Sequence, residues 1–206
     1  MQELFTFFKN IFNAIIIAFA FIGILKLHEQ HAFDDIIANI NDFITTRKEQ
    51  TTKEIGDFSN INPEFCVGSA VNLLGFKTIV TEHPASGQKM IILDTGKKQL
   101  ITSDDLYDDG LKEKLEELCK KFKYNSTTVE NIEIIENGEM HTYNRKVPYA
   151  KFNAKISKFP LSNVSGIVSV VEHDINNQKI LISINEKRKY SQLITTEFFK
   201  NVKDAK

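Results

Sequence analysis

Two histidines near the N-terminus have a spacing that resembles a metal site. His28 and His31 lie three positions apart, and Asp34 and Asp35 follow them. A helix would bring imidazole and carboxylate ligands to one face at this spacing. However, the spacing is not that of the H-E-x-x-H zinc motif, and the pair comes directly after an apolar run, where polar residues at a membrane–water interface are expected. We therefore interpret the pair as solvated interfacial residues and predict no metal site here.

Two acidic pairs are the second set of candidate ligands. Asp104-Asp105 and Asp108-Asp109 carry the oxygen ligands that Ca²⁺ prefers, but their spacing does not match an EF-hand loop. Both pairs precede a helical pattern, so helix capping explains them better. The chain contains no G-x-G-x-x-G, P-loop or G-x-S-x-G motif. We predict no catalytic residue, cofactor or small-molecule substrate, and we do not expect an enzyme.

The chain has two cysteines, Cys66 and Cys119. Cys119 falls on the apolar stripe of a predicted helix, which would point its thiol inward. In an exported domain, two inward cysteines favour a structural disulfide over two free thiols. Such a bridge would span 119 − 66 = 53 residues and would stabilise the fold by roughly 4 kcal/mol. There is no C-x-x-C motif, so a redox role is not expected.

The apolar run from Ile11 to Leu27 is the element on which the rest of the chain is organised. Lys9 and Lys26 flank it, and Asn13 is the only polar side chain before Lys26. A bilayer requires about 20 apolar residues, a length that the apolar residues before Lys9 complete. We predict one membrane helix over residues 1–27. The residues expected to hold it in the membrane are Ile15, Ile16, Ile17, Phe19, Phe21, Ile22 and Leu25.

Two other interpretations of this run stay open. A cleaved signal peptide would have a basic N-terminal region and a small-residue cleavage site; here the region is nearly neutral and no A-x-A pattern follows. A buried core helix is the other alternative, because short apolar runs are ambiguous.

The rest of the chain predicts an α+β protein in two parts. Residues 28–47 carry apolar residues at helical spacing and should continue the membrane helix as an amphipathic one. Residues 48–206 should form a globular head domain. The expected fold is thus a long N-terminal helix packed on an antiparallel sheet, with one further helix.

The head domain shows strand, turn and helix signals. Strands are expected at 77–81, 89–94 and 99–102, in a hairpin turning at Asn137-Gly138, and in a second hairpin of 167–172 with 179–184. A helix is expected from Leu111 to Phe122, a helix or edge strand at 191–202, and a short helix or irregular stretch at 64–74.

This layout resembles type IV pilins and pseudopilins. The shared features are an N-terminal helix that is half membrane-embedded and half amphipathic, a head with one cysteine pair, and, as in type IVb heads, a helix cysteine followed by a strand ending in Asn-Gly. The N-terminus diverges, since Lys9 stands fifth from Phe5, where pilins carry Glu. The resemblance implies a filament or secretion-apparatus subunit that assembles through its N-terminal helix.

Charge and location complete the expectations. The formal net charge is −1 with both signs interspersed, so no nucleic-acid partner is predicted. The partners implied are the membrane and further copies or related pilin-like subunits. We expect a single-pass protein of a bacterial inner membrane with its head in the periplasm or outside the cell. The alternative is an anchored extracytoplasmic binding domain that does not polymerise.

Overall fold

The computed structural model describes residues 48–73, 76–97, 99–120, 129–156, 163–174 and 177–205. The predicted membrane helix over 1–27 and its continuation over 28–47 lie outside these ranges. Within the described ranges, no helix has both the length and the apolar character needed to cross a bilayer.

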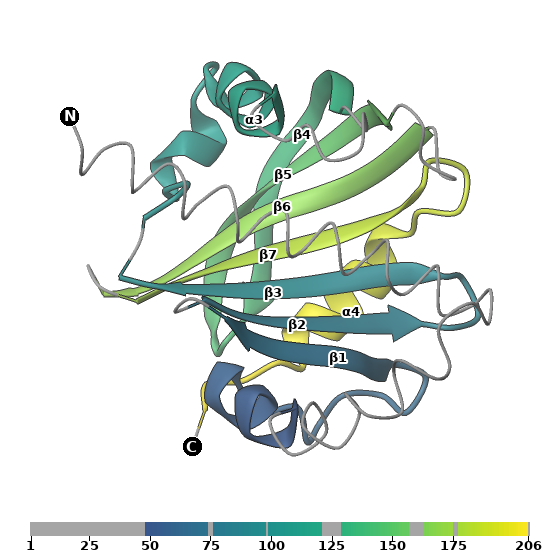
Figure 1. Ribbon diagram of the computed structural model, residues 1–206. Helices are drawn as coiled ribbons and strands as arrows, with labels where there is room; N and C mark the ends of the chain where they lie inside the picture. The colour runs from purple at the N-terminus through teal and green to yellow at the C-terminus, as the bar shows by residue number, and fades with distance from the viewer. Residues whose placement is uncertain are drawn as a thin grey trace.

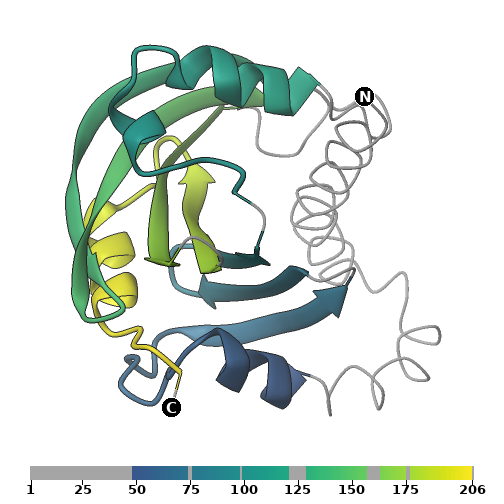
Figure 2. The ribbon, with the colours of Figure 1, turned by 90° about the vertical axis from the view of Figure 1, so that its left-hand side faces the viewer.

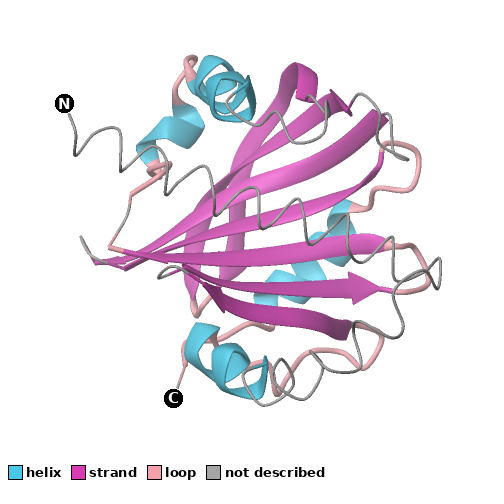
Figure 3. Ribbon diagram, viewed as in Figure 1, coloured by secondary structure: helices cyan, strands magenta, loops and turns pink. Residues whose placement is uncertain are grey.

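Seven antiparallel strands form one continuous sheet (Figures 1 and 3). The strands are β1 (Cys66–Leu73), β2 (Phe76–His83), β3 (Gln88–Gly96), β4 (Val129–Thr142), β5 (Arg145–Ile156), β6 (Asn163–Asp174) and β7 (Asn177–Glu186). Their order is β1-β2-β3-β7-β6-β5-β4. The sheet therefore consists of two meanders, β1–β3 and β4–β7, which join where β3 pairs with β7. β4 and β5 curve far out of the plane of β1–β3 (Figure 2).

The described helices are short. One spans residues 48–55, α3 is Leu111–Lys120, α4 is Gln192–Lys200, and a 3₁₀ turn, η1, is Asp104–Tyr107. The two faces of the sheet are named here after their helices. The α4 face carries the helix 48–55 and α4, and the α3 face carries η1 and α3.

The α4 face holds the larger cluster of buried side chains. Phe198 and Phe199 of α4 are fully buried there with their ring centroids 5.2 Å apart, and Phe198 also lies 5.2 Å from Phe65. The same cluster includes Met90 and Leu181 from the centre of the sheet. Aromatic rings bury large apolar areas, so this packing holds the C-terminal helix against both meanders.

A buried polar network fixes the start of α4. Gln88 is fully buried; its Nε2 donates to Ser183 Oγ at 3.0 Å and to Thr195 Oγ1 at 2.8 Å, and its Oε1 accepts from the Ser191 N–H at 2.8 Å. Ser191 also caps the helix by accepting from the Ile194 N–H. A buried amide is tolerated only when it is paired, so this network specifies the position of α4.

The predicted fold class is wrong for the described chain. The described residues are mostly strand, and no long helix packs on the sheet among them. The stretch Cys66–Leu73 is a strand instead of a helix or irregular segment, because its alternating side chains extend the sheet beyond β2. Residues 99–102 are not a strand. The strands expected within β2, β3, β6 and β7 and the helix beginning at Leu111 are confirmed.

The first predicted hairpin turn is also wrong. Asn137-Gly138 lies inside β4, opposite Ala150 and Tyr149, and the turn comes at Tyr143-Asn144. Both turn residues have positive φ, 48° and 57°, as a two-residue hairpin turn requires. Tyr143 tolerates this because it is fully buried: its hydroxyl donates to the Ile55 carbonyl at 3.1 Å and its N–H to the Val202 carbonyl at 2.9 Å.

Gly166 on β6 is predicted to be essential for the close packing of β6 against Ser183 and Phe152. A Cβ there would lie 2.4 Å from the Ser183 carbonyl oxygen and 2.8 Å from Phe152 Cζ. Gly166→Ala should therefore lower the free energy of unfolding by about 1–3 kcal/mol, the usual cost of overpacking, measured by urea denaturation.

Gly110→Ala is the matched control. Its Cβ would meet nothing closer than Asp108 Oδ1 at 3.5 Å, so its effect should stay within about 0.5 kcal/mol. Equal effects of the two substitutions would contradict the packing at Gly166.

Candidate functional site

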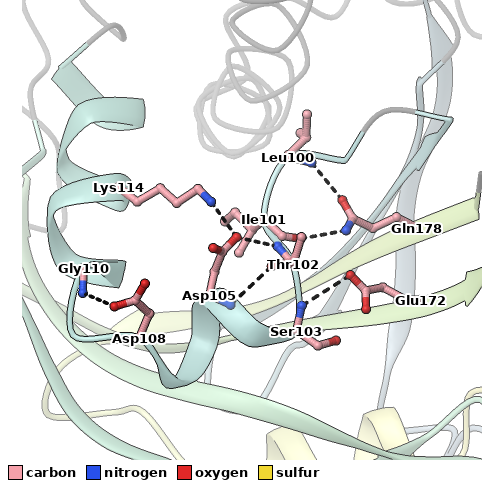
Figure 4. Close-up of polar contacts among 10 residues, drawn as sticks. All are labelled: Leu100, Ile101, Thr102, Ser103, Asp105, Asp108, Gly110, Lys114, Glu172 and Gln178. Atoms are coloured by element: carbon pink, nitrogen blue, oxygen red, sulfur yellow. Dashed lines mark hydrogen bonds and ion pairs between the residues drawn. The ribbon is translucent and has the colours of Figure 1, made fainter. Parts of the chain in front are cut away.

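The loop from Leu100 to Ser103 crosses the end of the sheet and is held by two side chains of the β6–β7 hairpin (Figure 4). Gln178 is 1% exposed; its Oε1 accepts from the Leu100 N–H at 3.0 Å, and its Nε2 donates to the Ile101 carbonyl at 2.6 Å. Glu172 accepts from the Ser103 N–H at 3.3 Å. These contacts pair buried backbone groups that would otherwise be costly, so the loop is positioned by the sheet.

One residue of each predicted acidic pair, Asp105 and Asp108, accepts a hydrogen bond from a nearby backbone N–H. Asp105 accepts from the Thr102 N–H at 2.7 Å and from Lys114 Nζ of α3 at 2.5 Å, and Asp108 Oδ1 accepts from the Gly110 N–H (Figure 4). Burial alone would raise the pKa of Asp105, but the hydrogen bonds from Lys114 and Thr102 hold it below its ordinary value. The two carboxylates thus stabilise the turn before α3.

No metal site forms among the described residues, where no group of three histidine, cysteine or acidic side chains could hold an ion. His28, His31, Asp34 and Asp35 lie outside the described ranges. The same is true of the predicted anchor residues: Ile15, Ile16, Ile17, Phe19, Phe21, Ile22 and Leu25.

Within the described part of the chain, β4, β5 and α4 bring together a quartet of hydrogen-bonded polar side chains at the surface: Glu136, Tyr149, Lys151 and Gln192. The Tyr149 hydroxyl donates to Glu136 Oε1 at 2.8 Å and accepts from Gln192 Nε2 at 2.8 Å. Lys151 Nζ donates to Gln192 Oε1 at 2.9 Å and lies 3.7 Å from Glu136 Oε2. Each member contacts two others, which fixes the orientation of all four.

The electrostatics of the quartet suit recognition by hydrogen bonding. Burial and the hydrogen bond to Glu136 raise the pKa of Tyr149, so its hydroxyl stays protonated at neutral pH. A protonated phenol is a donor and not a general base. Glu136 remains half exposed, which leaves carboxylate lone pairs available to a polar ligand.

Sequence reasoning missed this quartet because its members come from positions 136, 149, 151 and 192. They meet through two register shifts in β4 and through the packing of α4 on the sheet. The one local signal was the alternation of Tyr149 and Lys151, two residues apart and hence on the same face of a strand.

Cys66 differs from the expectation of an inward thiol. It begins the edge strand β1, and its thiol is free and exposed. α3, which carries Cys119, packs beside β4 at the other edge of the sheet; the side chain of Cys119 is not described. The pairing stays a prediction, without support from this arrangement.

No protein-family model matches the chain, and no curated protein matches it either.

The partly buried ion pair between Asp105 and Lys114 predicts a pH-dependent stability difference. Because its pKa is lowered in the folded state, Asp105 contributes stability above its unfolded pKa of about 3.9, and this contribution is lost as pH falls through the folded value. Asp105→Asn should therefore lower the free energy of unfolding by about 1 kcal/mol at pH 7, with the gap to the wild type closing below about pH 4.

Asp104→Asn is the control, since Asp104 is exposed on the same turn. Urea titrations at several pH values measure both variants. A gap for Asp105→Asn that persists unchanged in acid would contradict the role given to its charge.

The exposed thiol of Cys66 predicts rapid modification of the native protein. One equivalent of a thiol reagent should react with the folded protein, and Cys66→Ser should abolish that fast reaction. A protein purified without reductant that shows no reactive thiol until it is reduced would instead support the disulfide with Cys119.

Proposed function

We propose that this chain is a membrane-anchored binding domain that does not polymerise. Ile11–Leu27 anchors it in the bilayer, and residues 48–205 form the domain presented at the surface. The proposal rests on one observation: the same chain contains an apolar run and a continuous sheet with a preorganised polar quartet on its surface. Fixed donors and acceptors on a rigid sheet are what a specific polar ligand requires.

A pilin-like filament subunit is the other class that the sequence suggested. Its main argument was the layout of a long helix packed on a small head. The described residues form a seven-stranded sheet with a core on each face, and this observation favours a binding domain over a filament subunit. The anchor itself is common to both classes, and the proposal therefore keeps the anchor without the filament.

Charge insertion tests the anchor. Ile17→Lys should release the full-length protein from liposomes in a flotation assay, because a lysine near the centre of a membrane helix costs about 2.5–3.5 kcal/mol. Leu193→Lys is the matched control: Leu193 is 75% exposed on α4, and its replacement should leave flotation unchanged.

Shearing and fractionating cells that produce the full-length protein distinguishes the binding domain from the filament subunit. The proposal expects the protein in membranes and none in the sheared filament fraction. Recovery in filaments would overturn it in favour of a pilin-like subunit. A wild-type protein that does not float would overturn the anchor.

A further inference from the structure

The centre of the α3 face carries buried apolar side chains that are outside the clusters formed with the described helices and loop. Val80 of β2 and Ile91 of β3 are cross-strand partners on this face, and each is only 1% exposed. Ile91 in turn pairs with Ile182 of β7. Val80 and Ile91 nevertheless belong to none of the three hydrophobic clusters formed by the described residues.

The described loop and helices that pack on the α3 face cover other parts of it. The loop residues Leu100 and Ile101, together with Leu106 of η1 and Leu111 of α3, pack in the cluster that contains Leu93 and Ile180. A second cluster, bordered by Leu115 of α3, contains Ile132, Ala154, Val164 and Ile184. On the other side of Val80 and Ile91, Glu82 and Lys89 form an ion pair, with the Lys89 side chain 12% exposed. The patch Val80–Ile91–Ile182 lies beside these groups, and Ile182 at its border packs against the cluster of Leu93 and Ile180.

Among the segments outside the described ranges, Ile11–Leu27 is the most apolar. This segment of 17 residues has only two polar side chains, Asn13 and Lys26, whereas residues 28–47 are amphipathic and the stretches 121–128 and 157–162 are short. Even as a helix it would be about 26 Å long, which exceeds the width of β2, β3 and β7 together, at about 4.8 Å per strand.

The point where residues 1–47 join the domain also fits. Lys48 Nζ donates to the Val67 and Gly68 carbonyls of β1 at 2.8 and 3.1 Å, so the preceding chain starts beside the edge strand of this sheet. Residues 28–47 provide 20 residues of connection, which reach about 66 Å when extended. The centre of the α3 face is two strands away from β1.

We propose that Ile11–Leu27 covers the Val80–Ile91–Ile182 patch when no bilayer is present, and that the bilayer and the α3 face compete for this segment. The inference rests on the proposed anchor function. Burying an apolar side chain in lipid is nearly as favourable as burying it in a protein interior. Moving the segment from the α3 face into the bilayer therefore costs little hydrophobic free energy. The anchor then remains shielded from water before membrane insertion.

A single tryptophan tests this in the full chain, which contains none. Ile17→Trp places the reporter in the segment, and size-exclusion chromatography with light scattering isolates the monomer. Without lipid, the emission of this introduced tryptophan should be blue-shifted and poorly quenched by acrylamide. Adding Val80→Glu should shift the emission to the red and raise acrylamide quenching severalfold. Leu193→Glu, at an exposed position of α4, should change neither.

Three outcomes decide the docking. Protected emission in the monomer that Val80→Glu exposes supports it. Emission exposed in the monomer, or protected only in oligomers, overturns it. If Val80→Glu loses the sheet signal in circular dichroism, Val80→Ala replaces it. Folded Val80→Ala should raise acrylamide quenching more modestly. Unchanged quenching in this variant also overturns the docking.

Vesicles of brominated phosphatidylcholine then separate this inference from the proposed function. Quenching of the introduced tryptophan by the brominated lipid shows insertion of the anchor. Protected emission without lipid, but no quenching by the brominated lipid, would leave the docking standing and overturn the anchor. Lipid quenching together with an exposed reporter in the lipid-free monomer would leave the anchor standing and overturn the docking.

Discussion

The pairing of β3 with β7 is the contact on which the rest of this fold depends. It runs from Lys89 opposite Ile184 to Gly96 opposite Gln178 and joins two meanders that are distant in sequence. Each meander alone would bury a smaller fraction of its apolar surface, because the fraction of surface buried on folding rises with the size of the folded unit. Joined, they form a sheet wide enough for helices to pack on both faces, and the Gln88 network connects β3, β7 and α4 across the junction. Gln178, which holds the loop before η1, lies on β7 at this junction.

The two faces differ in how they are used. The α4 face is closed by the aromatic cluster around Phe198 and by the Gln88 network, and beyond the start of α4 it displays the polar quartet. The α3 face is more uniformly apolar at its centre, where Thr78 is the nearest buried polar side chain. A buried lysine marks the end of the α4 face: burial lowers the pKa of Lys179, whose Nζ lies 5.2 Å from the Tyr143 ring centroid. Such a contact partly offsets the cost of burying an amine.

Sequence patterns located the central strands because alternating or continuous β-branched runs such as KTIVT and KMIILD follow strand periodicity closely. They failed where tertiary contacts override local preference. Asn-Gly is a strong turn signal, yet Gly138 lies inside β4, where a Cβ would be 2.7 Å from the Tyr149 ring. The turn lies at residues 143–144 instead, where the buried Tyr143 hydroxyl donates to the Ile55 carbonyl. The strand order and the quartet were not predictable, because the residues next to Glu136 and Gln192 in the sequence carry no signal that these two side chains share one site.

The β3–β7 junction is tested most directly by nuclear Overhauser effects between backbone protons of the full-length protein. The account predicts cross-strand signals between Ile91 and Ile182 and between Leu93 and Ile180, in antiparallel register. Signals that pair β3 with any other strand beyond β2, or that shift this register, would contradict the seven-stranded sheet and, with it, the two faces from which the proposals are drawn.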